Sequence, residues 1–293
     1  MYFIRIIRNV NIYIITKEAH MKRFIFLLTF FICTIIGTYE VLAFERVHIL
    51  NTKQSDCILV EGKEGAFLID CGWESHEGYI KDYLVNKGIK KLDFIILTHY
   101  HDDHRGGIKY LCKEFNVDKV YMSPHKNLYR DDLHEYFTHN NVGVDYIKVG
   151  WTLNSKDMSL RAIGPIKVDK EIENNNSIAI SANIDGIKYL FMGDAEKEEE
   201  EDMVKNNLVP NCDVLKVAHH GLNTSSIEKF LEKAKPQISI ITTDGEESPE
   251  KEVINRLNKI NSKIFMTHKN EDIIIGRNKN TKEFEILVNP MVE

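Results

Sequence analysis

The residues from Thr98 to His104 read Thr-His-Tyr-His-Asp-Asp-His, which places three imidazoles and two carboxylates within seven positions. They come directly after an apolar run, Leu92–Leu97, that predicts a buried strand. The polar residues are therefore expected in the loop at the C-terminal end of that strand. Nitrogen and carboxylate ligands bind zinc-like ions at about 2.0–2.2 Å, and only a tight turn brings side chains so close in sequence around one centre. The stretch predicts a metal site.

The spacing within this stretch favours two ions over one. His99 and His101 are two positions apart and can point at one ion, whereas Asp103 and His104 turn toward a second. Two ions about 3.5–4 Å apart hold a hydroxide that attacks phosphorus or carbonyl carbon. The alternative, a polar loop with scattered histidines, is disfavoured because further ligand types occur downstream.

Residues elsewhere in the chain extend the predicted site. Asp194 follows an apolar run and a glycine, so its carboxylate can emerge at a sheet edge and bridge two ions; an ordinary turn is the alternative. His219 and His220 also follow an apolar run, and one of them should face inward while its neighbour contacts substrate. Asp70 ends another strand, where it either orients a ligand imidazole or simply forms a turn.

The elements that position these residues alternate along the chain. Short β-branched runs are followed by helical patterns, which predicts an α/β layered fold of one domain, with its polar clusters beyond the C-terminal ends of strands. The predicted helices are Glu77–Asn86, Gly107–Phe115, Leu128–Thr138, Ser226–Ala234 and Pro249–Leu257. The acidic run Glu196–Asp202 predicts a further helix with a solvated face.

The net charge of the chain limits the kinds of molecule that it is expected to bind. Residues 1–43 contain five basic and two acidic side chains, which leaves 33 basic and 42 acidic in residues 44–293, a net charge of −9. Proteins that hold long nucleic acids usually carry a basic patch or stripe, and the sequence shows none.

The N-terminus predicts export. Residues 21–43 contain a basic start, an apolar stretch at Phe24–Gly37 and small residues up to Ala43, which is the pattern of a secretory signal peptide. The apolar stretch is short for a membrane helix, which needs about 20 residues, so an uncleaved anchor is the alternative. Residues 1–20 are then an upstream extension and residues 44–293 the hydrolase domain. We expect a secreted or cell-surface protein that touches the membrane only through an uncleaved anchor.

Four cysteines lie beyond residue 43 at spacings that match no zinc ribbon or redox motif. Cys57 and Cys71 flank two predicted strands joined by a turn, so a disulfide between them is one interpretation. Buried free thiols are the other.

These motifs together resemble the metallo-β-lactamase superfamily, and the resemblance covers residues 45–290. Its members share the order of the following residues: Asp70, Thr98–His104, Gly193-Asp194 and His219. More narrowly, Gln54–Asp56, Asn174–Ile178 and Leu215–Gly221 resemble the extracellular hydrolase domain of ComEC-type competence proteins. The resemblance implies an αββα sandwich with two metal ions, usually zinc and alternatively manganese, in a groove at one edge of both sheets.

Matched position by position, the resemblance implies a ligand set. His99 and His101 would bind the first ion. Asp103, His104 and His219 would bind the second, and Asp194 would bridge both. Asp103 would also orient the attacking hydroxide.

Two positions depart from the family pattern. Many members have a further histidine for the first ion, where this chain offers only Glu173 and Asn174–Asn176. Relatives often carry a histidine before Ser-Pro, where this chain has Asp244–Ser248. A substrate-contacting group is therefore missing unless His220 or His268 replaces it.

The sequence thus predicts a metal-dependent hydrolase, with a phosphodiester as the first choice of substrate because the ComEC-like branch is associated with DNA. The net charge of −9 favours a short oligonucleotide, a nucleotide or a cell-surface phosphodiester such as a choline phosphate ester. A β-lactamase is the first alternative, disfavoured by the missing histidine. A non-catalytic surface-binding module is the second, disfavoured by the complete ligand motif. No protein partner is inferred.

Overall fold

The computed structural model describes residues 46–63, 65–278, 281 and 283–288. The predicted extension and the signal peptide or anchor lie outside these residues and stay predictions. No helix in the described part is long and apolar enough to cross a bilayer.

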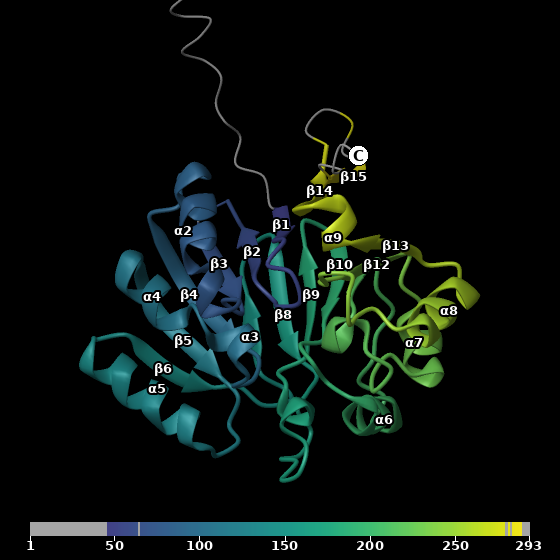
Figure 1. Ribbon diagram of the computed structural model, residues 1–293, viewed down its shortest axis with the longest axis horizontal. Coiled ribbons are helices and arrows are strands. Elements are labelled where there is room, and N and C mark those ends of the chain that lie inside the picture. The colour runs from purple at the N-terminus through teal and green to yellow at the C-terminus, as the bar shows by residue number, and fades with distance from the viewer. Residues whose placement is uncertain (1–45, 64, 279–280, 282, 289–293) are drawn as a thin grey trace, which may run out of the picture. The chain divides into compact units, whose positions relative to one another are not determined.

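Two mixed sheets form the centre of the fold (Figure 1). The first has the strand order β15-β14-β1-β2-β3-β4-β5-β6, and the second has the order β13-β12-β11-β10-β9-β8-β7. The strands of the first sheet are β1 (Arg46–Ile49), β2 (Ile58–Glu61), β3 (Ala66–Ile69), β4 (Lys91–Leu97), β5 (Asn116–Met122), β6 (Gly143–Tyr146), β14 (Ile273–Arg277) and β15 (Phe284–Val288). Those of the second are β7 (Thr152–Asn154), β8 (Met158–Ala162), β9 (Ile180–Ile184), β10 (Ile187–Phe191), β11 (Val214–Lys216), β12 (Ile238–Ile241) and β13 (Lys263–Met266).

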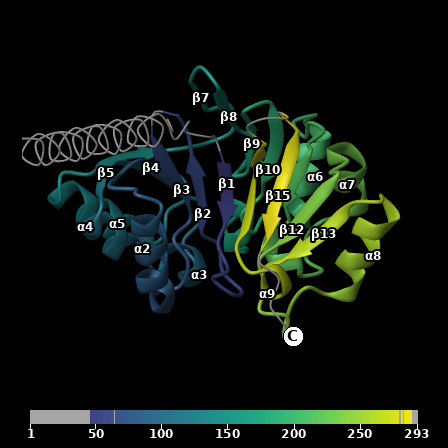
Figure 2. The ribbon, with the colours of Figure 1, turned by 90° about the horizontal axis from the view of Figure 1, so that it is seen from above.

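Helices cover the outer face of each sheet (Figure 2). Those beside the first sheet are α2 (Glu77–Asn86), α4 (Ile108–Glu114) and α5 (Leu128–His139). Those beside the second are α6 (Lys197–Lys205), α7 (Glu228–Ala234) and α8 (Lys251–Lys259). The one-turn helices α3 (Asp102–Arg105) and α9 (Thr267–Asn270) follow strands β4 and β13. This arrangement confirms the predicted α/β sandwich with αββα layers.

The apolar side chains alternate between two environments. In β3, Phe67 and Ile69 pack into the core between the sheets, whereas Leu68 packs beneath the helices. Both faces of the strand are therefore buried, which explains why its sequence is a continuous apolar run. Phe67 and Phe94 stack with their ring centroids 4.3 Å apart inside the sandwich.

Parallel pairing brings the functional loops together. β3, β4 and β5 are parallel neighbours in one sheet, and β10, β11 and β12 are parallel neighbours in the other. The C-terminal ends of parallel strands meet at one edge of a sheet, where α/β proteins place their sites. The residues after β3, β4, β10 and β11 are therefore candidates for one common site.

The four cysteines in the described part of the chain are free thiols. Cys57 and Cys71 are fully buried in the apolar cluster beneath the helices, and burial raises the pKa of both well above the ordinary range. The free-thiol interpretation is confirmed, and Cys57 and Cys71 do not form a disulfide.

The acidic helix α6 differs from the expectation of a solvated face. Glu199 and Glu200 are buried, because each carboxylate accepts backbone hydrogen bonds from a neighbouring segment. Glu199 accepts from the Ile166 amide at 2.9 Å, and Glu200 accepts from the Ser226 and Ile227 amides at 2.8 Å each. Glu200 thereby satisfies free N–H groups at the start of α7.

Glu200 should make stability fall as the pH rises. Burial raises its pKa from 4.5 to about 8, so the folded protein keeps a proton that the unfolded chain releases between these values. The contribution of the protonated Glu200 side chain to the free energy of unfolding is fully present below about pH 4.5 and is lost toward pH 8. Glu200→Gln cannot ionise, so its free energy of unfolding should fall less steeply between pH 5 and pH 8. Urea unfolding at several pH values measures the slopes, with exposed Glu201→Gln as control; parallel curves for wild type and Glu200→Gln would contradict the assignment.

Candidate metal centre

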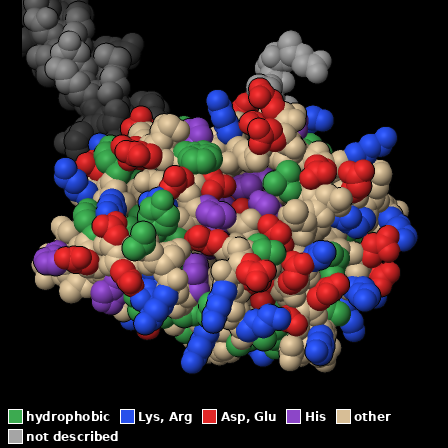
Figure 3. All heavy atoms as spheres, turned by 60° about the horizontal axis from the view of Figure 1, so that its bottom comes forward, with side chains coloured by type: hydrophobic (Ala, Val, Ile, Leu, Met, Phe, Trp, Pro, Cys, Tyr) green, Lys and Arg blue, Asp and Glu red, His purple; other side chains and the backbone are tan. Residues whose placement is uncertain are grey.

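Four strand ends supply the polar side chains of the site. Asp70 follows β3, Thr98–His104 follows β4, Asp194 follows β10, and His219-His220 follows β11. On the space-filled surface, histidine side chains gather with acidic ones near the middle of one face (Figure 3).

Glycines allow the loops to approach closely. Gly193 has a φ of 53°, and a Cβ there would lie 3.0 Å from the side chains of Thr98 and Ser177. The end of β10 therefore meets the end of β4 only because residue 193 has no side chain. A Cβ on Gly106 would lie 2.3 Å from the Glu74 amide nitrogen, so this glycine lets α3 pack against the loop after β3.

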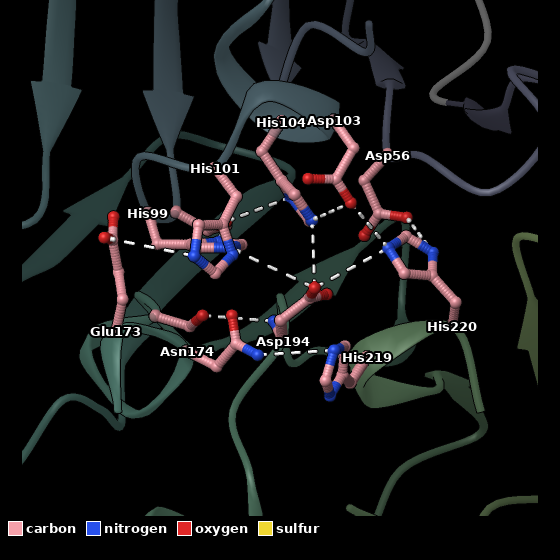
Figure 4. A network of polar contacts seen from close by, with 12 residues as sticks. Asp56, His99, His101, Asp103, His104, Glu173, Asn174, Asp194, His219 and His220 are labelled. Carbon is pink, nitrogen blue, oxygen red and sulfur yellow. Dashed lines mark hydrogen bonds and ion pairs between the residues drawn. The ribbon is translucent and has the colours of Figure 1, made fainter. Parts of the chain in front are cut away.

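Four ligand atoms converge on one point, which we call the four-residue position: Asp103 Oδ2, His104 Nε2, Asp194 Oδ2 and His220 Nε2 (Figure 4). His104 Nε2 is 3.5 Å from Asp103 and 3.2 Å from Asp194, and His220 Nε2 is 3.2 Å and 3.6 Å from the same two oxygens. Ligands at about 2.0–2.2 Å in tetrahedral geometry are separated by about 3.3–3.6 Å. His104 Nε2 and Asp194 Oδ1 are buried without a hydrogen-bond partner. The residues therefore fit a four-coordinate metal ion.

A second group, the His99–His101 position, lies beside the first. His99 Nε2 is 3.1 Å from His101 Nδ1 and 3.9 Å from Asp194 Oδ2. Asp194 Oδ2 thus lies between the two positions, as a bridging carboxylate requires. The other nitrogen of His101, Nε2, is 3.9 Å from Glu173 Oε2.

The two adjacent histidines after β11 separate. Both have a left-handed backbone, with φ of 49° at His219 and 52° at His220, so their side chains point in different directions. His220 enters the four-residue position, whereas His219 Nδ1 is 2.8 Å from Thr224 Oγ1 and its Nε2 is 3.3 Å from Asn174 Nδ2. The structure therefore brings His220, and not the His219 that the resemblance implied, to the four-residue position.

Neighbouring acceptors orient the ligand imidazoles. Asp70 Oδ2 accepts from His104 Nδ1 at 2.7 Å, and the same carboxylate accepts from the amide and hydroxyl of Thr98 at 2.8 Å each. His220 Nδ1 donates to the carbonyl of Thr242 at 3.0 Å. Each contact holds the proton on Nδ1 and leaves the Nε2 lone pair for a metal. The structure thus places Asp70 where it can orient a ligand imidazole, as predicted.

The charges at the site suit a cation. Burial opposes ionisation of Asp103, but His104 and His220 lower its pKa to about 2. Burial likewise opposes ionisation of Asp194, and the neighbouring imidazoles nevertheless hold its pKa well below the ordinary range. Burial, together with His104, holds the pKa of His99 well below its ordinary value. The carboxylates are therefore anionic and His99 is neutral, which are the forms that bind metal ions. Burial opposes protonation of His104 and His220, but the neighbouring carboxylates raise the pKa of both, so a metal ion would displace a proton from each.

Sequence reasoning missed a supporting ion pair. Lys216 Nζ is 2.8 Å from Asp56 Oδ2, and both side chains are at most 2% exposed. Asp56 Oδ1 accepts from Thr242 Oγ1 at 2.6 Å, and Thr242 in turn holds His220. A lysine within the apolar run Val214–Val217 was the available signal, because a charged residue in a buried strand needs a partner.

An open cavity of about 480 Å³ adjoins the four-residue position at Asp103. Its walls include Lys53, Trp73, Asp244 and Glu247. The Trp73 side chain is held by a hydrogen bond from its Nε1 to the Gln54 carbonyl at 3.1 Å, yet the residue remains 40% exposed.

The segment Asp244–Ser248, where relatives often carry a histidine, lies beside this cavity. Asp244 and Glu247 of the Asp244–Ser248 segment line the cavity. His268 packs against the turn at Gly245, where an added Cβ would meet its ring at 2.7 Å, and it is absent from the described ligand groups.

His220→Ala and His219→Ala distinguish the two histidines. Removing His220 deletes one of four converging ligands, so we expect the affinity for the tightest zinc ion to fall by about 100-fold or more. His219→Ala should leave this affinity within about threefold of the wild type, because its ring lies outside the four-residue position. Zinc binding against a competing chelator measures both. A larger loss in His219→Ala would restore the assignment made from the resemblance.

Lys216→Met tests the buried ion pair. The substitution keeps the length of the side chain but leaves Asp56 buried without its cation, which should lower the free energy of unfolding by about 3–5 kcal/mol. Lys91→Met removes an exposed ion pair with Asp118 and should change stability little. Urea denaturation measures the free energy of unfolding of both variants. Equal values for the two would show that the pair of Lys216 and Asp56 contributes nothing to stability.

Comparison with known proteins gives the family. Residues 50–245 match the family described as "Metallo-beta-lactamase superfamily". ComE operon protein 3 of Bacillus subtilis (strain 168) is 28% identical over 256 residues, which cover 78% of this chain and 32% of that protein. Endoribonuclease YSH1 of Candida albicans is 22% identical over 209 residues, covering 62% of this chain and 24% of that protein. The chain thus spans about a third or less of the length of these curated relatives.

A solved structure shares the fold. The metallo-beta-lactamase fold protein YhfI from Bacillus subtilis superposes with a TM-score of 0.52 at 12% identity, covering 84% of this chain and 100% of that one. The ComE operon match confirms the predicted resemblance to ComEC-type proteins. With the family match over residues 50–245, the two-sheet fold and the converging histidines and carboxylates, this chain belongs to the metallo-β-lactamase superfamily of metal-dependent hydrolases.

Proposed function

We propose that this protein is a phosphodiesterase that uses two metal ions, zinc or alternatively manganese, and acts on nucleotides or short oligonucleotides. The observation that carries the proposal is the pair of adjacent positions that share the buried carboxylate of Asp194. Paired metal positions of this kind suit in-line displacement at phosphorus, because both the attacking and the leaving oxygen need stabilisation. A competence-operon relative and a relative named as an endoribonuclease support this choice of substrate.

The chain's own residues prepare the site for this chemistry. When bound, the ions would supply an activated water near neutral pH and would neutralise charge on the attacked phosphate. His104 and His220 are fixed as Nε2 ligands by Asp70 and Thr242. Asp103 is the most exposed member of the four-residue position, with 17% of its side chain accessible, and it alone of the four lines the cavity. It is therefore placed to accept a hydrogen bond from the attacking water and to orient it.

The cavity beside Asp103 suits a short substrate. The exposed indole of Trp73 offers a surface on which a base can stack, and base stacking on an aromatic side chain tolerates different sequences. Lys53 is the one lysine or arginine among the residues lining the cavity and can pair with a flanking phosphate. The net charge of −9 in residues 44–293 disfavours a long polyanion. Together with the N-terminal pattern, this favours an exported enzyme that acts on small or cell-surface phosphodiesters.

Hydrolysis of bis(p-nitrophenyl) phosphate tests the proposal. We expect turnover that a chelator abolishes and that Asp194→Ala lowers by about 1,000-fold or more, because the variant loses the ligand shared by both positions. The control is Asp118→Ala, an exposed aspartate near the N-terminal end of β5, which should keep wild-type turnover.

Two results would contradict the phosphodiesterase assignment. One is metal binding without turnover of this ester or of a dinucleotide. The other is rapid hydrolysis of a chromogenic cephalosporin in the absence of phosphodiesterase activity, which would identify the enzyme as a β-lactamase.

A further inference from the structure

The two metal positions differ in how many ligands they obtain from the residues already assigned. The four-residue position has two imidazoles and two carboxylates at tetrahedral spacing. The His99–His101 position has two imidazoles and the shared carboxylate of Asp194, which is 3.9 Å from His99 Nε2. Structural zinc sites take four protein ligands and catalytic sites take three with a water, so the three protein groups here leave room for one further donor.

Glu173 is close to His101 but lies on its far side. Its Oε2 is 3.9 Å from His101 Nε2, whereas the atom of His101 that faces His99 is Nδ1. Glu173 Oε1 accepts hydrogen bonds from the Tyr100 amide and from Asn127 Nδ2, each at 3.2 Å. Glu173 is therefore too far from His101 for a hydrogen bond, and it lies on the side of the imidazole away from His99.

Asn174 carries a buried side-chain oxygen beside the His99–His101 position. The residue is 7% exposed, and its side-chain oxygen Oδ1 is buried without any hydrogen-bond partner. A buried carbonyl oxygen without a hydrogen-bond partner is destabilising, so such groups in native proteins are rare. In Figure 4 this oxygen lies on the side of His101 and Asp194, while the amide nitrogen points toward His219.

The orientation of the Asn174 amide is fixed by its partners. Nδ2 donates to Glu196 Oε1 at 2.9 Å and lies 3.3 Å from His219 Nε2. A carboxylate at Glu196 can only accept, so the nitrogen must lie on that side and the oxygen on the opposite side of the amide. His219, displaced from the four-residue position, thus helps to aim Asn174.

We propose that Asn174 Oδ1 is the remaining protein ligand of the His99–His101 position, where it stands in place of a third imidazole. An amide oxygen is a harder and weaker donor for zinc than an imidazole nitrogen. The two positions are therefore unequal: the four-residue position binds zinc first, and the His99–His101 position binds it more weakly and accepts manganese more readily. This inference rests on the same metal centre as the proposed function but does not require catalysis.

Zinc titration of the full chain tests this assignment. The wild type should bind one zinc ion tightly and a second at least about tenfold more weakly. Asn174→Leu keeps the shape of the side chain but removes the oxygen, so it should weaken only the second ion, by about tenfold or more. Asn174→Asp keeps an oxygen and should retain the second ion. Asn174→His supplies an imidazole and should tighten the second zinc constant while reducing the preference for manganese.

Several results would overturn the assignment. They are a single zinc ion in the wild type, an unchanged second constant in Asn174→Leu, or an equal loss in Asn174→Asp and Asn174→Leu. Circular dichroism and thermal melting of the metal-free proteins show whether a variant folds. If Asn174→Leu does not fold, the histidine variant decides, because an unchanged second constant there also overturns the proposal. No substrate is used, so a protein that binds metal in this way without hydrolysing phosphodiesters would contradict the proposed function alone.

Discussion

The buried carboxylate of Asp194 is the group on which the rest of the site depends. It is 1% exposed, and its Oδ2 lies 3.2 Å from His104, 3.6 Å from His220 and 3.9 Å from His99. A carboxylate in an apolar interior is strongly destabilising unless charge or hydrogen bonds compensate for it. Here the compensation comes from imidazoles carried by the other sheet and by the neighbouring strand, so the site exists only when the two halves of the sandwich are assembled.

The arrangement of the strands brings the imidazoles to Asp194, and local sequence alone would not. Parallel strands from each sheet end at a common edge, and Gly193 and Gly106 allow the loops to approach within van der Waals contact. Beneath them, the buried pair of Lys216 and Asp56 supports Thr242, which orients His220. Three carboxylates, Asp70, Asp103 and Asp194, lie within 3.5 Å of His104, an excess of negative charge that a divalent cation would relieve.

The sequence predicted most of the elements because their patterns are local. The apolar run predicted at Leu92–Leu97 lies within β4, and helix α2 has the predicted bounds, since burial of a strand and one-sided burial of a helix leave direct traces in the residue order. The hairpin strand β7 was missed because it is short and mostly exposed. The metal stretch after β4 was also recognisable, because ligands close together in sequence need only one turn to converge.

Other features depended on distant contacts and could not be read from local patterns. The choice between His219 and His220 follows from two successive left-handed residues. The burial of Glu199 and Glu200 follows from free amides in other segments, including one at the start of α7. The unpaired oxygen of Asn174 becomes visible only when Glu196 and His219 are placed beside its amide.

The central claim is that metal ions bind where the loops after β4, β10 and β11 meet. Diffraction from zinc-soaked crystals, collected at the zinc absorption edge, tests it directly. We expect the strongest anomalous peak among Asp103, His104, Asp194 and His220, with a weaker peak beside His99 and His101. A peak coordinated by His219, or no peak near Asp194, would contradict it.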